Sequence, residues 1–116
     1  MPVKDFLDDV AVRDPSRYAY FEDVLLPLLN EHGPGLGGPH VRKLAPTAFW
    51  EIRWSGSDRG HHRLYCTVEP GRRMLLLHGC TKRWRRFDPL DRQVCRDRHD
   101  DYRSGGYDAA TRLARA

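Results

Sequence analysis

The hydrophobic residues of this chain change their spacing near residue 49. Before that point they recur every three or four positions, as on one face of a helix, at Tyr18, Phe21, Leu25 and Leu28. After it they alternate with more polar residues, as on one face of a strand, at Trp50, Ile52 and Trp54. The change predicts helices first and a sheet after them, so we expect an α+β fold.

Two helices are predicted before the change in spacing. The first covers residues 4–12, where Phe6, Leu7 and Val10 share one helical face. The second begins at Asp14, an N-cap candidate that is followed by a proline at the first helical position. Pro27 should kink or split this helix, and Gly33 should end it. The glycine- and proline-rich residues 33–39 are expected to form a loop.

Three antiparallel strands and a final helix are predicted after the loop. The strands cover residues 49–54, 62–69 and 73–79, and the third is apolar on both faces, as expected of a central strand. The helix begins at Asp88 and Pro89 and continues for about four turns to Tyr102. The expected architecture is two N-terminal helices, a small antiparallel sheet of three to four strands and a C-terminal helix.

We expect the helices to cover one face of this sheet and to leave the other face open. Arg53, Arg63 and Tyr65 alternate with the apolar rows of their strands, so they should lie on the open face. Residues 1–104 are expected to form the domain. Residues 105–116 are short and weakly amphipathic, and we expect a mobile tail with Leu113 as a docking contact.

Length and charge narrow the class of protein. A chain of 116 residues has room for one ordinary domain. Its net charge of +4 divides unevenly, because residues 1–43 carry 5 basic and 7 acidic side chains and residues 44–116 carry 15 and 9. A polyanionic partner would therefore meet the second half. No apolar run approaches the roughly 20 residues of a membrane span, so we expect a cytoplasmic protein with no membrane partner.

Cysteine and histidine spacing argues against a metal site. The three cysteines, Cys66, Cys80 and Cys95, form no C-x-x-C pair, so we expect reduced, mostly buried thiols. His78 and Cys80 would supply only two ligands from one strand. We therefore expect no metal and no other cofactor. His78 is interpreted as a hydrogen-bonded residue near the cleft, with acid–base work as the alternative.

A glycine motif in the predicted loop does not indicate a nucleotide site. Gly33, Gly35 and Gly38 match G-x-G-x-x-G, but that motif works between a strand and a helix. Here a helix precedes the motif and prolines interrupt it.

The densest cationic feature follows the third predicted strand, where four cations surround a tryptophan at Lys82, Arg83, Trp84, Arg85 and Arg86. Arginine matches phosphate oxygens with a planar fork, and tryptophan offers a face on which a base can stack. A solvated loop that keeps the protein soluble is the plain alternative. The neighbouring Arg53, Arg63 and Tyr65 favour RNA binding, with Trp84, Arg85, Arg86 and His78 as contacts.

Metal-independent RNA cleavage needs a proton acceptor for the 2′-hydroxyl, positive charge on the phosphorane and a proton donor for the leaving oxygen. Arginines suit the second task. A lysine crowded by arginines should have a lowered pKa, which makes Lys82 a candidate for proton transfer. Tyr65 would orient the sugar or stack on a base. For Arg53 and Arg63, a surface ion pair with Glu51 or Glu69 is an equally good interpretation.

Four motifs in order resemble the HigB-like, often phage-derived, branch of the RelE toxin superfamily. They are WEIR (residues 50–53), RLY (63–65), LLLHGCTKR (75–83) and a following helix with Arg98 and Tyr102. Upstream, FLDDV, NEHG and a loop with Pro39 and Leu44 agree as well, so the resemblance covers residues 3–103.

The resemblance implies a RelE-like fold and the toxin of a type II toxin-antitoxin pair. Such toxins cleave mRNA, commonly on the ribosome, by metal-independent attack of the 2′-hydroxyl, and a neighbouring gene encodes the antitoxin, here expected to be a helix-turn-helix protein. The implied catalytic set is Arg53, Arg63, Tyr65, Lys82 and Arg83.

Two departures from the family pattern leave a second function open. The family usually has an aromatic residue where Cys80 stands and a lysine where Arg83 stands, and arginine cannot act as a base. The alternative is therefore a catalytically silent module of the same fold, which acts with its antitoxin as a nucleic-acid-binding or corepressor subunit.

Overall fold

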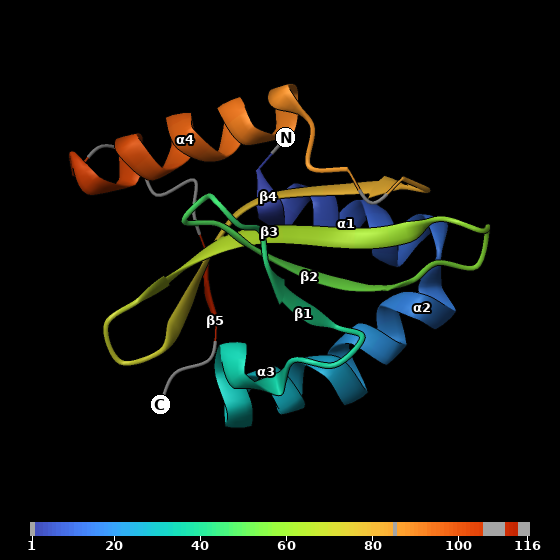
Figure 1. Ribbon diagram of the computed structural model, residues 1–116. Helices are drawn as coiled ribbons and strands as arrows, with labels where there is room; N and C mark the ends of the chain where they lie inside the picture. Colours follow the sequence, from blue (N-terminus) through green and yellow to red (C-terminus); the bar gives the residue numbers. More distant parts are fainter. Residues whose placement is uncertain (1, 85, 106–110, 114–116) are drawn as a thin grey trace.

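The computed structural model describes residues 2–84, 86–105 and 111–113. Helices come first, a five-stranded antiparallel sheet follows in the order β1-β2-β3-β4-β5, and helix α4 is inserted between β4 and β5 (Figure 1). The predicted α+β class and the order of its elements are confirmed. Within the described ranges, each helix is too short or too polar to cross a bilayer.

The N-terminal helices follow the prediction closely. Helix α1 covers Val3–Arg13, and a nearly continuous segment follows as α2 (Pro15–Tyr20), the π-helical turn η1 (Phe21–Leu25) and α3 (Leu26–His32). The amide of Leu26 donates to the carbonyl oxygen of Phe21, five residues back. Pro27 has no N–H and its ring crowds the carbonyl four residues before it, so a wider turn precedes it. Gly33, with φ of +57°, ends α3.

The three predicted strands are present as β2 (Trp50–Ser55), β3 (His61–Glu69) and β4 (Arg73–Lys82), and β4 continues three residues beyond the prediction. Strands β1 (Val41–Lys43) and β5 (Thr111–Leu113) were not predicted, because three residues are too few to show a period. The predicted loop contains a 3₁₀ turn over Gly33–Leu36 (η2). Strand β5 pairs with β4 within the segment expected to be a tail, and the other residues of that tail, 106–110 and 114–116, lie outside the described residues.

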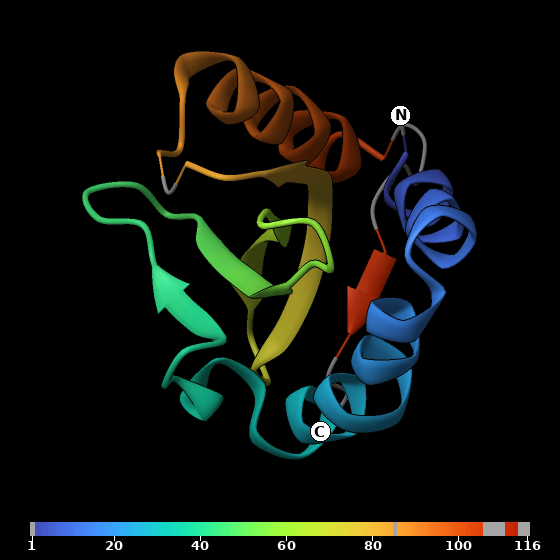
Figure 2. The ribbon, with the colours of Figure 1, turned by 90° about the vertical axis from the view of Figure 1, so that its right-hand side faces the viewer.

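The first core lies between α1–α3 and one face of the sheet, and Figure 2 shows these helices along one side of it. The helices contribute Val3, Phe6, Val10, Phe21, Leu25 and Leu29, and the strands contribute Ile52, Trp54, Leu64, Cys66, Met74 and Leu76. Gly79 permits the close approach of α1 to β4, because a Cβ at this position would lie 2.3 Å from the Phe6 ring. The predicted apolar rows are therefore the buried face of the sheet.

Helix α4 (Pro89–Arg103) covers part of the opposite face, which corrects the expectation that all helices share one face. Its Cys95 and Tyr102 pack with Tyr65, Leu75 and Leu77 in a second core cluster. Arg98 on α4 also donates to the carbonyl oxygen of Leu77, at 2.8 Å. The physical reason is the two-sided apolar character of β4, because Leu75 and Leu77 need a cover of their own.

Candidate functional site

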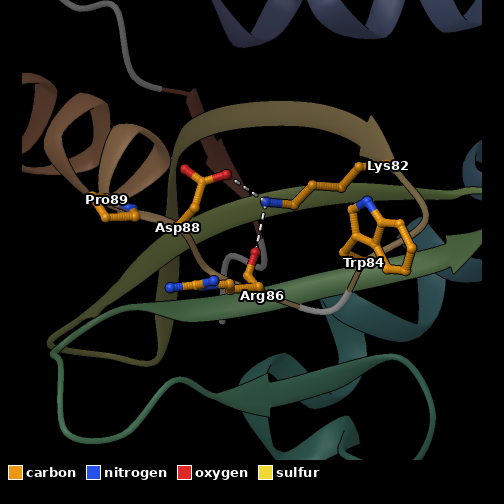
Figure 3. A pocket seen from close by; sticks show the side chains of 5 residues that line it. All are labelled: Lys82, Trp84, Arg86, Asp88 and Pro89. Atoms are coloured by element: carbon orange, nitrogen blue, oxygen red, sulfur yellow. Dashed lines mark hydrogen bonds and ion pairs between the residues drawn. The ribbon is translucent and has the colours of Figure 1, made fainter.

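A hollow of about 790 Å³ lies where the chain passes from β4 to α4. Its lining comprises Lys82, Trp84, Arg86, Asp88 and Pro89, all drawn in Figure 3. Strand β4 ends at Lys82, and α4 begins with Asp88 as its N-cap, whose side chain accepts from the amide of Asp91 at 2.9 Å. The Trp84 side chain is 75 % exposed, so its ring faces solvent at this hollow.

The ammonium group of Lys82 is held by three acceptors. It donates to the carbonyl oxygen of Arg86 at 2.6 Å, to Asp91 Oδ2, and to Asp88 Oδ2 at 3.4 Å. Partial burial acts to lower the pKa of Lys82, whereas the hydrogen bond and charge of Asp91 and the charges of Cys80 and Asp88 act to raise it. The raising effects are larger, so the pKa of Lys82 lies above its ordinary value. The predicted lowering is wrong, because the carboxylates of Asp91 and Asp88 outweigh the effect of partial burial.

Asp91 also binds His78, whose Nε2 lies 2.9 Å from Asp91 Oδ1. A carboxylate only accepts, so Nε2 carries the proton. Burial lowers the pKa of His78 more than Asp91 raises it, and the charge of Arg98 lowers it further. The predicted hydrogen bond of His78 is confirmed. Its predicted contact with RNA stays a prediction.

Arg63 and Tyr65 lie beneath this region, and both are completely buried. Arg63 Nη1 donates to Glu51 Oε2 at 2.9 Å, and Glu51 also accepts from Arg42 at 2.9 Å. The ion-pair interpretation is confirmed for Arg63, although the pair is buried rather than on the surface. Burial raises the pKa of Tyr65, and the phenol contacts the Phe87 ring with a centroid distance of 4.7 Å.

The other predicted residues are placed less closely together. Arg53 lies opposite Arg63 on the same face, half-buried, and its Nε donates to the carbonyl oxygen of Pro39 at 3.0 Å. Arg83 is exposed directly after β4, and Arg85 lies outside the described residues. The structure thus gathers Lys82, Trp84 and Arg86 at the hollow and puts Arg63 and Tyr65 underneath.

Sequence reasoning missed the two carboxylates that hold Lys82. Asp88 was assigned only as a helix cap, and Asp91 was not singled out. Their spacing of three residues at the start of a helix is a usable signal, because it puts both carboxylates on the first turn, next to the preceding loop.

A second polar cluster lies on the opposite side of the sheet from α4. Asp14 Oδ2 is 2.8 Å from His62 Nε2, and His62 Nδ1 is 2.8 Å from Thr81 Oγ1. The amide and hydroxyl of Ser57 also donate to Asp14, at 2.9 and 2.6 Å. Burial acts to raise the pKa of Asp14, but these hydrogen bonds prevail and lower it to about 2. Asp14 is the N-cap residue of α2 and Pro15 follows at the first helical position, as predicted, but the Asp14 side chain makes no capping hydrogen bond to α2.

The cysteines are free thiols, as predicted, with Cys66 and Cys95 buried and Cys80 partly exposed. Burial raises the pKa of all three, to about 11 for Cys80 and about 12 for Cys95. In residues 2–84, 86–105 and 111–113, no three His, Cys, Asp or Glu side chains are grouped to hold a metal ion.

The fold and the site together define a small α+β protein with a cationic, tryptophan-bearing loop between β4 and α4. The chain belongs to the family described as Phage derived protein Gp49-like (DUF891), whose model matches residues 16–100. This is a family of phage-derived proteins similar to RelE and other toxins. No curated protein and no solved structure matches the chain.

Proposed function

We propose that this protein is the HigB-like toxin of a type II toxin-antitoxin pair, and that it cleaves mRNA on the ribosome by attack of the 2′-hydroxyl. The observation that carries the proposal is the hollow after β4, where Lys82, Arg86 and the exposed Trp84 lie together in a member of a toxin-like family. A site for single-stranded RNA needs cations that bind the phosphates and an aromatic ring on which a base can stack.

The geometry favours a division of roles. Lys82 has a raised pKa and is protonated at neutral pH, so it would stabilise the phosphorane or donate a proton to the leaving oxygen rather than act as a base. Its longest contact is the one with Asp88, at 3.4 Å, and a phosphate oxygen would replace this contact first. Arg83, exposed at the end of β4, would bind a neighbouring phosphate.

A silent binding module is the second candidate, and it is favoured by one observation. The implied catalytic residues Arg63 and Tyr65 are completely buried, and Lys82 is already engaged by two carboxylates. Such a module would bind RNA, or DNA together with its antitoxin, through the exposed part of the loop without cleaving it.

Expression of the protein alone separates these candidates. We expect growth arrest and new mRNA 5′ ends, detected by primer extension, for the wild type and for Arg13→Ala, which removes an exposed cation from α1. Lys82→Ala should lower the cleavage rate about a hundredfold, because one phosphorane-stabilising charge is lost. Lys82→Arg should keep part of the activity if the charge is what matters.

Thermal unfolding of each purified variant shows whether it is folded. Soluble, folded wild-type protein that leaves growth and transcripts unchanged would contradict the toxin proposal. Salt-dependent RNA binding without new 5′ ends would instead support the binding module.

A further inference from the structure

The walls of the hollow differ in chemistry. Trp84 presents an exposed aromatic ring, Lys82 and Arg86 provide positive charge, and Asp88 and Pro89 form the wall at the start of α4 (Figure 3). A volume of about 790 Å³ is within the range of sites that bind small organic groups. An aromatic wall, a cation and a carboxylate around one space suit a planar group that carries hydrogen-bond donors.

Asp88 has acceptor capacity that its protein contacts leave unused. An ionised carboxylate offers about four lone-pair positions. Oδ1 accepts from the amide of Asp91 at 2.9 Å, and the backbone of Leu90 also hydrogen-bonds the carboxylate. Oδ2 accepts from Lys82 only at the long distance of 3.4 Å. The side chain is 40 % exposed, so its oxygens can be reached from the hollow. By contrast, one carboxylate oxygen of Asp91 binds His78 and the other binds Lys82, and the Asp91 side chain is only 13 % exposed.

We propose that this hollow binds one unstacked base of single-stranded RNA against Trp84, and that Asp88 makes guanine the preferred base. The proposal rests on the proposed function and names the part of the substrate that this loop would read. Splayed-out bases are commonly recognised by stacking on an aromatic ring and by hydrogen bonds to their Watson–Crick edge.

The preference for guanine follows from the acceptor-only chemistry of a carboxylate. Guanine has two adjacent donors on its Watson–Crick edge, N1–H and the 2-amino group, and a carboxylate can accept from both. Adenine and cytosine each offer an amino group next to a ring nitrogen acceptor, which a carboxylate repels. Uracil offers a single N–H between two carbonyl oxygens. Hydrogen bonds to a charged group are the strong ones, so one carboxylate is enough to discriminate.

The test measures binding of four labelled RNA 11-mers that have uridines throughout except for a central G, A, C or U. Ribose 2′-O-methyl groups prevent the proposed 2′-hydroxyl attack, so fluorescence anisotropy reports binding alone. For the wild type we expect the G oligonucleotide to bind about tenfold more tightly than the U oligonucleotide. Trp84→Ala should weaken binding of all four by about tenfold, because stacking tolerates every base.

Asp88→Asn should abolish the preference for guanine, because the amide replaces one acceptor with a donor. Asparagine caps helices as well as aspartate does, so the start of α4 stays intact. Asp101→Asn is the matched control: it removes the same charge from the same helix, about 20 Å further along it, and should leave the preference unchanged.

Four results would overturn the proposal. Equal affinity for all four oligonucleotides, or a guanine preference that survives Asp88→Asn, rejects the role of Asp88 while RNA binding and the proposed function stand. Affinity that does not change in Trp84→Ala rejects the base pocket and indicates that the ring serves a protein partner. If no oligonucleotide binds, the base pocket is also rejected. The growth and primer-extension assays then test the proposed function independently.

Discussion

At the scale of single residues, Arg63 lies in a motif that implies catalysis but forms a structural ion pair. The RLY motif implies a catalytic arginine, yet this side chain is completely buried and donates to the equally buried Glu51. Its Nε and Nη2 have no hydrogen-bond partner within the described ranges. The pair therefore depends on the surrounding sheet, and loss of one member leaves a buried charge.

Arg63→Ala is expected to lower the free energy of unfolding by about 3 to 5 kcal/mol, because Glu51 keeps its burial and loses its buried partner. Arg42→Ala should lower it by at most about 1 kcal/mol, because the Arg42 side chain is 42 % exposed. Urea denaturation measures both. Equal effects of the two changes would refute the structural role of Arg63.

The double change Glu51→Leu with Arg63→Met extends this experiment to activity. It should recover most of the stability, because neither charge is left alone in the core. If the recovered protein still cleaves mRNA, Arg63 has no catalytic role. If it is folded and inactive, the resemblance assigned Arg63 correctly.

At the scale of secondary-structure elements, Asp14 ties three segments together. It lies between α1 and α2, accepts hydrogen bonds from Ser57 in the β2–β3 turn, and contacts His62 on β3, which in turn contacts Thr81 at the end of β4. The cluster therefore fixes the helical layer against the sheet on the face opposite α4.

Asp14→Ala is expected to lower the free energy of unfolding at pH 7 by about 2 kcal/mol, since it removes hydrogen bonds to a charged acceptor. The folded-state pKa of Asp14, about 2, lies below its usual 3.8. Its ionised form therefore stabilises the protein fully above about pH 5, and this stabilisation is lost as pH falls from 4 towards 2.

Urea denaturation at several pH values checks this dependence. The difference in the free energy of unfolding between wild type and Asp14→Ala should decrease steadily below pH 4. Asp5→Ala, an exposed position in the first turn of α1, is the control and should show a small effect. A difference that stays constant down to pH 2 would mean that the Asp14 carboxylate is not the titrating group.

At the scale of the whole molecule, acidic and basic side chains are concentrated in different parts of the chain. The acidic excess lies in residues 1–43, which supply the helical layer, and the basic excess lies in residues 44–116, which supply β2–β4, the loop after them and α4. Part of that positive charge is neutralised within the protein, because Lys82 and Arg63 are both paired with carboxylates. In the proposed function, the exposed cations Arg83 and Arg86 of the loop would contact the RNA backbone.

Binding of single-stranded RNA should therefore weaken with salt, and the double change Arg83→Gln with Arg86→Gln should reduce the slope of log K against log salt by about 1.4. The control removes two exposed cations elsewhere, Arg13→Gln with Arg103→Gln, and should leave the slope unchanged. Titrations between 50 and 200 mM salt measure the slope. Equal slopes in wild type and both variants would refute an RNA contact at this loop.

Local interactions made much of the fold predictable from sequence. The change from a 3.6-residue to a 2-residue period separates helices from strands, and the Asp88–Pro89 signature marks the start of α4. Pro27 alters the helix that contains it, and the two-residue alternation correctly puts Arg53, Arg63 and Tyr65 on one face of the sheet. These features depend on backbone geometry and on neighbours within a few positions.

The tertiary structure alone decided what covers each residue. Whether Arg63 and Tyr65 face solvent depends on where α4 and Phe87 lie, and the pKa of Lys82 depends on carboxylates six and nine residues further along the chain. The strands β1 and β5 exist because longer strands offer them hydrogen-bonding edges. Sequence thus determined the residue types and their faces, whereas burial and ion pairing were decided by long-range packing, because desolvation and charge depend on distance in space.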